Sequence, residues 1–231
     1  MVSRLTFFGY PISHYCVAVD RMLAYKRLSA RAVLVSYHDK RELLERTGQD
    51  FVPALLSGRR VVRWWEISDF LERLRPSPAL YPAGREGLAR VLENWGHQVL
   101  EERVWRAVVT RAAETFHDPV ERWVFEELQT RSRGTFELLR AQEPEYRREL
   151  NEYLALVERT LDGHAWLLDE PSAADFGVYG GLSPLFAVGE GLSARYPAVR
   201  RWSKAIQNLG PPAFPWPPGP ERGKRRRDTP T

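Results

Sequence analysis

The chain has 231 residues, of which 43% are hydrophobic and 28% charged, and its formal net charge is +4. This composition is ordinary for a soluble globular protein, and no apolar run approaches the roughly 18 residues that a membrane-spanning helix needs. Residues 221–231 hold five basic and two acidic side chains, so the rest of the chain is almost neutral and has no global attraction to nucleic acid.

Cysteine and histidine usage limits the chemistry further. Cys16 is the single cysteine, which excludes an internal disulfide and a cysteine-based metal site. The histidines His97, His117 and His164 have no ligand partners at metal spacing, so we expect no metal. The N-terminus lacks the basic start and apolar core of a signal peptide, and we expect a cytoplasmic protein that does not bind a membrane.

The first 80 residues alternate between strand and helix patterns. Strands are predicted at 5–8 and 31–37 around a helix that begins after Ser13, with a short helix or turn at 40–46. A hairpin at 51–63 and a helix at 65–74, which Pro76 ends, complete the order β-α-β-(α)-β-β-α. This order is that of a thioredoxin-like domain, and we assign it residues 1–80.

The remainder of the chain is helical in pattern. A Pro-rich linker at 77–85 leads into helical periodicity to about residue 209, with apolar stripes at 88–99, 120–139 and 150–161. Ser172 and Asp175 form a capping box before another apolar run. We therefore expect an α/β domain followed by an all-helical bundle at 85–210. Residues 211–231 are Pro-rich and then basic, and we expect a disordered tail.

Ser13 is the first candidate for chemistry. It follows a strand and a Gly-Pro loop, and it stands where a helix N-terminus directs backbone N–H groups outward. Such a terminus favours an anion, including a thiolate, and the serine hydroxyl can add a hydrogen bond to it. The same serine can instead serve only as a helix cap, and the sequence leaves both roles open.

The stretch Phe7–Tyr15, followed by Lys26, resembles the opening of cytosolic glutathione transferases. The catalytic residue of the Ser/Cys type falls on Ser13, whereas the Tyr-type position falls on Phe8, which has no hydroxyl. The resemblance extends over about residues 3–209. It implies glutathione or another low-molecular-weight thiol as co-substrate, a small-molecule electrophile and a homodimer.

The resemblance also implies a thiol-binding set. Val52-Pro53 matches the family's Val-Pro, which has a cis proline and pairs the valine backbone with the cysteinyl part of glutathione. His38 and Lys40 lie where some relatives bind the glycyl carboxylate. Tyr15 and Trp105 are candidates for the electrophile pocket, although an aromatic residue on a helical stripe is more often part of the core.

One position departs from the family pattern. The Gln/Glu-Ser pair that holds the γ-glutamyl end falls on Arg63-Trp64, or on Trp64-Trp65 if the register shifts by one residue. Neither pair offers a carboxylate for an ammonium group. Two functions therefore stay open. One is a glutathione transferase-like enzyme that uses Ser13. The other is a non-catalytic binding or interaction module with the same fold that has lost glutathione binding.

Overall fold

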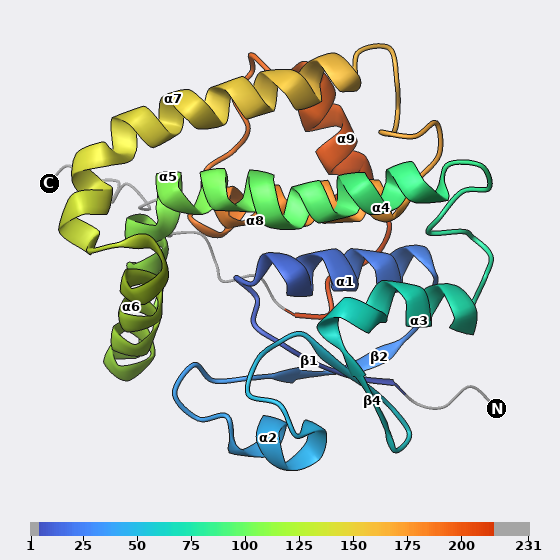
Figure 1. The fold of residues 1–231 in the computed structure, drawn as a ribbon, viewed down its shortest axis with the longest axis horizontal. Helices are drawn as coiled ribbons and strands as arrows, with labels where there is room; N and C mark the ends of the chain where they lie inside the picture. The colour runs from blue at the N-terminus through green and yellow to red at the C-terminus, as the bar shows by residue number, and fades with distance from the viewer. Residues whose placement is uncertain (1–4, 215–231) are drawn as a thin grey trace, which may run out of the picture.

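The computed structural model describes residues 5–214 (Figure 1). The expected fold class is confirmed: a small α/β part is followed by a helical part. Of the tail expected at 211–231, residues 215–231, which include the basic run, lie outside the described residues. The elements of the α/β part, in chain order, are β1 (Leu5–Gly9), α1 (His14–Tyr25), β2 (Ala30–Leu34), α2 (Arg41–Thr47), β3 (Ala54–Ser57), β4 (Arg60–Arg63), the 3-10 turn η1 (Trp64–Glu66) and α3 (Ile67–Leu74).

The four strands form one sheet in the order β2-β1-β3-β4, in which β1 and β2 are parallel and the other neighbours antiparallel. Figure 1 shows α1 and α3 between the sheet and the helical part, while α2 lies on the opposite side. Because helices cover both faces of β1, its consecutive residues Phe7 and Phe8 are both fully buried. This sandwiching explains the apolar run that predicted the strand.

The helical part starts with one continuous rod, because α4, the π-helical turn η2 and α5 follow each other without a break. Its elements are α4 (Glu86–Trp95), η2 (Gly96–Leu100), α5 (Glu101–Ala113), α6 (Pro119–Arg133), α7 (Phe136–Thr160), α8 (Ala173–Ala187) and α9 (Pro197–Gln207). None of the helices within residues 5–214 is long and apolar enough to cross a membrane.

The stripe at 120–139, expected as one helix, belongs to two. Gly134 ends α6 with a φ of 103°, a conformation that side chains disfavour, and Thr135 then caps α7 by accepting a hydrogen bond from the Leu138 N–H at 3.3 Å. The apolar stripe at 150–161 is the C-terminal half of α7. The sequence pattern did not reveal this break, because the apolar residues on either side of it keep nearly the spacing of one continuous helix.

Helix α8 is the buried centre of the helical part, and the predicted capping box begins it. The Asp175 carboxylate accepts hydrogen bonds from the Ser172 N–H at 2.9 Å and from the indole N–H of Trp202 at 2.8 Å. Asp175 and Ser172 are fully buried, so these donors replace the water that the carboxylate loses. One acidic side chain thus joins the start of α8 to α9.

Glycines let α8 lie unusually close to its neighbours. A Cβ on Gly96 would come within 2.4 Å of the Gly177 backbone, and a Cβ on Gly181 would come within 2.4 Å of the Gly96 carbonyl oxygen. On the side facing α1, a Cβ on Gly180 would lie 2.6 Å from the carbonyl oxygen of His14. Contacts this short exclude any side chain.

The apolar stripe of α4 mostly faces solvent. Val91 is 64% exposed, and Leu88 on the same helix and Val99 on the following η2 are also exposed, whereas Ala89 on α4 and Gly96 on η2 are buried against α8. Small residues therefore form the buried face of this helical segment, because they permit close approach to α8. The larger apolar residues remain exposed to solvent.

The chain end described by the structure packs on α1. The ring of Phe214 lies 4.9 Å from that of Phe7, centroid to centroid, and is buried. The Ala213 N–H donates to the Asp20 carboxylate at 2.6 Å, and Arg21 donates to the Gly210 carbonyl at 2.8 Å. Residues 210–214 thus bind back to the α/β part.

The glycine contact generates a stability prediction. Gly177→Ala should lower the free energy of unfolding by about 2 kcal/mol, because the new methyl would overlap the backbone of Glu93 on α4. Gly87→Ala is the matched control: nothing lies within 4 Å of its Cβ position, so it should be neutral or slightly stabilising. Urea unfolding measures both, and equal effects would contradict the packing argument.

Candidate functional site

Four loops meet at one edge of the sheet. Phe8 pairs with Ala54, and Ala54 pairs with Arg63, while Gly9 pairs with Leu34 in the parallel pair. The same edge of the sheet is therefore bordered by four segments, those that follow β1, β2 and β4 and the one that precedes β3. Each of the predicted thiol-binding residues lies in one of these segments or, for Arg63, at the last position of β4, so the topology brings them to one side of the molecule.

Ser13 is the N-cap of α1, in an extended conformation with φ −74° and ψ 120°. Its Oγ accepts a hydrogen bond from the Cys16 N–H at 3.4 Å, and its own N–H donates to the Tyr10 carbonyl at 3.2 Å. The predicted cap is confirmed. Its neighbours Ile12 and Tyr15 line two different cavities, and the half-buried Ser13 lies between them while lining neither.

The Val52–Pro53 peptide bond is cis, as the family pattern implies. The side-chain amide of Gln49 supports this turn, donating to the carbonyl oxygens of Phe51 at 2.8 Å and Pro53 at 3.4 Å. Gln49 is buried, so the turn is held from inside the domain. Because Ala54 opens β3 opposite Phe8, the cis proline lies at the same sheet edge as the loop that leads to Ser13.

Arg63 and Trp64 stand at the end of β4 and the start of η1. Arg63 is exposed, and its guanidinium lies 5.6 Å from the centroid of the Trp65 ring. Glu66 supplies a carboxylate nearby, but it accepts the Arg63 backbone N–H at 3.3 Å and serves as a cap. Trp64 turns toward a cavity. The turn therefore presents an exposed cation and a ring, with its carboxylate already engaged.

His38 and Lys40 follow β2. The Nδ1 atom of His38 lies 3.1 Å from a carboxylate oxygen of Glu121 on α6, which also accepts the Tyr37 N–H at 2.7 Å. Lys40 precedes α2 as its N-cap without a side-chain capping bond. Neither His38 nor Lys40 lines the cavity that holds Trp64. Glu121, which sequence reasoning missed, ties this loop to the helical part.

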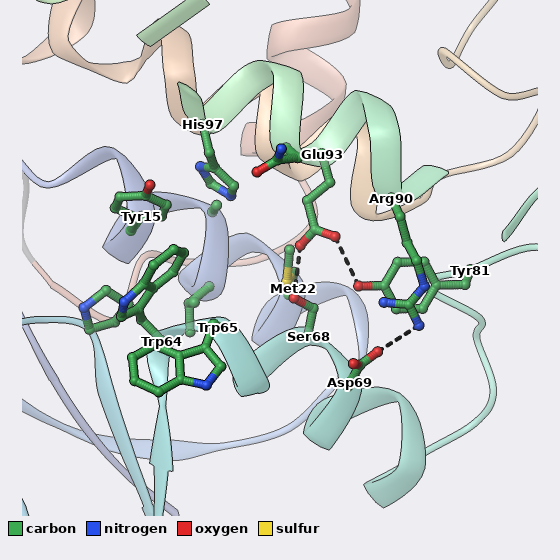
Figure 2. Close-up of a pocket in the computed structure, with 14 residues that line it drawn as sticks. Tyr15, Met22, Trp64, Trp65, Ser68, Asp69, Tyr81, Arg90, Glu93 and His97 are labelled. Atoms are coloured by element: carbon green, nitrogen blue, oxygen red, sulfur yellow. Dashed lines mark hydrogen bonds and ion pairs between the residues drawn. The ribbon is translucent and has the colours of Figure 1, made fainter. Parts of the chain in front are cut away.

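A cavity of about 250 Å³ lies between α1, α3 and α4, and we call it cavity 1 (Figure 2). One end is aromatic, because the Tyr15 ring lies 4.7 Å from that of Trp64 and 4.6 Å from that of His97. The other end is polar and contains Glu93, beside which Figure 2 shows Ser68, Tyr81 and Arg90. Pro53 also lines this cavity.

A second cavity, cavity 2, of about 370 Å³ lies between the β1–α1 loop, the segment after β2 and the α5–α6 connection. Its wall is mostly apolar: the Tyr10 ring stacks on Tyr37 at 4.1 Å, and Phe116 meets Tyr37 edge-on at 5.3 Å. Glu121 lies at its rim with its carboxylate bound to the loop after β2. Cavity 2 suits an apolar molecule.

The two residues proposed for an electrophile pocket are not brought together. Tyr15 lines cavity 1, whereas Trp105 is 5% exposed and lines neither cavity. The Trp105 ring packs against Phe125, at 5.9 Å between centroids, and Phe125 in turn packs on Phe116 at 4.9 Å. Trp105 thus supports the wall of cavity 2 from behind as part of the core.

A buried titratable cluster beside Ser13 was missed from the sequence. Burial raises the pKa of Glu101 to about 7 even though Arg133 donates to it at 2.8 Å. His14 lies 3.6 Å from Glu101, and burial lowers the pKa of His14 well below its usual range and that of His97 to about 3. The i, i+4 spacing of His97 and Glu101 was the available signal. Within residues 5–214, no three His, Cys, Asp or Glu side chains could together hold a metal ion.

The family follows from comparison with known domains. The N-terminal domain of glutathione S-transferases matches residues 7–63, and the C-terminal domain of glutathione S-transferases matches residues 106–205. These two matches cover more than half of the chain, which therefore belongs to the glutathione S-transferase superfamily. No curated protein matches the chain.

Solved structures support the fold. A glutathione S-transferase from Rhodospirillum rubrum F11 is 22% identical with a TM-score of 0.70, covering 91% of this chain and 90% of its own. Glutaredoxin 2 from Salmonella typhimurium, solved in complex with glutathione, is 18% identical with a TM-score of 0.72 and coverage of 90% and 94%. The beta-etherase LigF from Sphingobium sp. strain SYK-6 is 19% identical with a TM-score of 0.65 and coverage of 90% and 96%.

The buried cluster generates a pH prediction. Because burial raises the pKa of Glu101 from 4.5 to about 7, the folded chain keeps a proton that the unfolded chain loses in this range. The stability that this group contributes is therefore fully present below pH 4.5 and is lost as pH rises to 7. Gln does not ionise, so Glu101→Gln should gain about 3 kcal/mol relative to wild type across this window.

Urea unfolding of both proteins at a series of pH values measures this difference, and the two histidines cancel because both proteins contain them. A variant that instead loses stability relative to wild type as pH rises would mean that the ion pair with Arg133 outweighs burial.

Proposed function

We propose that the protein is a thiol transferase of the cytoplasm that joins glutathione, or another low-molecular-weight thiol, to an electrophile. One observation carries the proposal: the Ser13 hydroxyl stands at the N-terminus of α1, at the sheet edge that also holds Val52 and Pro53. A glutathione complex is known for one structural relative, glutaredoxin 2 from Salmonella typhimurium, which supports the choice of thiol.

The chemistry follows from that position. The Ser13 Oγ accepts the Cys16 N–H, and its hydroxyl hydrogen can donate to the sulfur atom of a bound thiol. This bond and the positive end of α1 favour a thiolate over a thiol, so the thiol releases its proton to solvent. The thiolate then attacks the electrophile and forms a carbon–sulfur bond, while a leaving group departs with the electron pair or the adduct takes a proton from water.

The thiol's backbone would pair with Val52. Its carboxylate groups have two cationic side chains at the same sheet edge, the exposed Arg63 and the half-buried Lys40, whereas His38 is already engaged with Glu121. Trp64 offers a ring face to the same ligand. This assignment differs from the family's Gln/Glu-Ser pair, because the turn here attracts anions.

For the electrophile we propose cavity 2, in place of the pair Tyr15 and Trp105. It begins at Ile12, next to Ser13 in the chain, and its apolar wall favours an apolar molecule. The thiolate at Ser13 would then lie between the residues that hold the thiol, such as Val52 and Arg63, and the electrophile in cavity 2.

A non-catalytic binding module is the second candidate function. Two observations favour it: the β4–η1 turn engages its carboxylate in a cap, and Ser13 lines neither cavity 1 nor cavity 2. In that case Ser13 contributes only the cap of α1. Activity measured beside stability separates the two functions.

We also propose a homodimer through α4. Leu88 and Val91 on α4 and Val99 on the following η2 leave an apolar stripe on the outside, and burial of such a stripe against a second copy removes it from water.

Ser13→Ala tests the catalytic role. It should lower kcat/KM by about 10²-fold, because the thiolate loses a hydrogen bond, and should cost about 1 kcal/mol of stability as a lost cap. Thr135→Ala is the matched control, since Thr135 caps α7 through the Leu138 N–H far from the sheet edge and should cost similar stability with unchanged kcat/KM. Equal activity in both variants would reject the catalytic role.

Val91→Glu tests the dimer. A charge at the centre of the α4 stripe should shift the protein from dimer to monomer in sedimentation experiments, because the carboxylate would have to be buried. Leu156→Glu on α7 is the control, since Leu156 is also an exposed apolar residue and should leave the assembly unchanged. A monomeric wild-type protein would refute the proposal.

A further inference from the structure

Cavity 1 contains an acid without an ion-pair partner. Glu93 is half-buried, and desolvation raises its pKa. Its two carboxylate oxygens accept hydrogen bonds from neutral donors only, Ser68 Oγ at 2.8 Å and Tyr81 Oη at 2.8 Å (Figure 2). Among residues 5–214, no Lys or Arg nitrogen lies within 4 Å of it. A carboxylate offers about four acceptor sites, so two remain for a ligand.

The other charges of the cavity are already paired. Arg90 donates to Asp69 at 2.7 Å, and its guanidinium lies 4.0 Å from the centroid of the Tyr81 ring. The lining therefore holds two carboxylates and one guanidinium, and Glu93 is the acid left over. Arg90 acts on the Glu93 carboxylate only from beyond ion-pair distance, so an anionic ligand would meet this carboxylate, whereas a cation could pair with it directly.

The rest of the wall also favours a cation. Tyr15, Trp64 and Trp65 line the cavity together with Glu93, and the two indoles meet edge to face at 89°. Aromatic faces attract cations, and the attraction grows where water is excluded. A volume of about 250 Å³ is small for a ligand site, so it fits a small group rather than a large molecule.

We propose that cavity 1 binds a primary ammonium group, with Glu93 as the acceptor of its N–H donors and the aromatic rings at its sides. The ligand is either a small free amine or the amino end of the thiol, because Pro53 and Trp64 border both the sheet edge and cavity 1. Only the second source rests on the function proposed above.

The hydrogen bonds from Ser68 and Tyr81 do not require a negative charge on Glu93. A variant that removes only the charge therefore distinguishes a role in binding a cation from a structural role. Glu93→Gln keeps one acceptor oxygen for Ser68 or Tyr81, its amide NH2 can donate to the oxygen of the other hydroxyl, and its volume is nearly the same, so the fold should be preserved. Glu86→Gln, on the exposed first turn of α4, is the matched control because it removes one negative charge from the same helix outside the cavity.

The test is a titration of the full chain with n-butylammonium chloride at constant ionic strength, followed by the indole N–H signals of Trp64 and Trp65 in nuclear magnetic resonance spectra. Trp64→Phe and Trp65→Phe assign these signals. We expect a saturable shift in wild type and in Glu86→Gln, and binding at least tenfold weaker in Glu93→Gln. A wild type without a saturable shift, equal binding in Glu93→Gln, or an equal response to neutral n-butanol would overturn the proposal.

A second arm separates the two sources. Glutathione that displaces n-butylammonium, while N-acetylglutathione does not, supports the amino end of the thiol as the occupant. An unchanged affinity for n-butylammonium in the presence of glutathione supports a free amine. Neither result depends on an electrophile or on turnover, so a failed transferase assay leaves the ammonium site standing, and an absent ammonium site leaves the transferase proposal intact.

Discussion

The close approach of α8 to its neighbours is the constraint on which the rest of the structure depends. Gly180 lets α8 lie against the His14 carbonyl on α1, and Gly177 lets it lie against the backbone of Glu93 on α4. The residue after Ser13 and the acid of cavity 1 are therefore both set by the same buried helix. Asp175 fixes where that helix begins, through bonds to Ser172 and to Trp202. The α/β part and the helical part are joined through backbone contacts, which leave little room for sliding.

This arrangement puts two unlike cavities on either side of the α1 N-terminus. Cavity 1 is bordered by carboxylates and aromatic rings, whereas cavity 2 is largely apolar, and the short stretch from Ile12 to Tyr15 separates them. A hydroxyl between a polar and an apolar compartment is suited to a reaction in which a charged sulfur compound meets an uncharged partner. Glu121 closes one side of the apolar compartment by holding the loop after β2 through the Tyr37 N–H. Opening of that contact would widen access to it.

Local sequence signals predicted what local geometry determines. The order of elements along the α/β part, the Ser13 cap, the Val52–Pro53 turn and the Ser172 capping box each follow from short stretches of sequence, and each is present. The side chains that complete the candidate site depend on packing between distant segments. Glu93 joins the site because the small residues Ala89 on α4 and Gly96 on η2, rather than the large apolar residues, face α8, and the hydrophobic pattern favoured the opposite face. Trp105 was expected at a ligand pocket but became core, because Phe125 from another helix covers it.

Because residues 210–214 pack on α1, the reactivity of one buried side chain can report when this segment separates from the helix. Cys16 is the single cysteine of the chain, is 1% exposed, and lies beneath the segment that ends in Phe214; burial raises the pKa of its thiol to about 12. A thiol-specific reagent therefore reacts with it only when the C-terminal segment and α1 separate. The labelling rate measures the frequency of that separation. An assay that counts free thiols in the presence of the folded protein therefore detects an added thiol and not the protein.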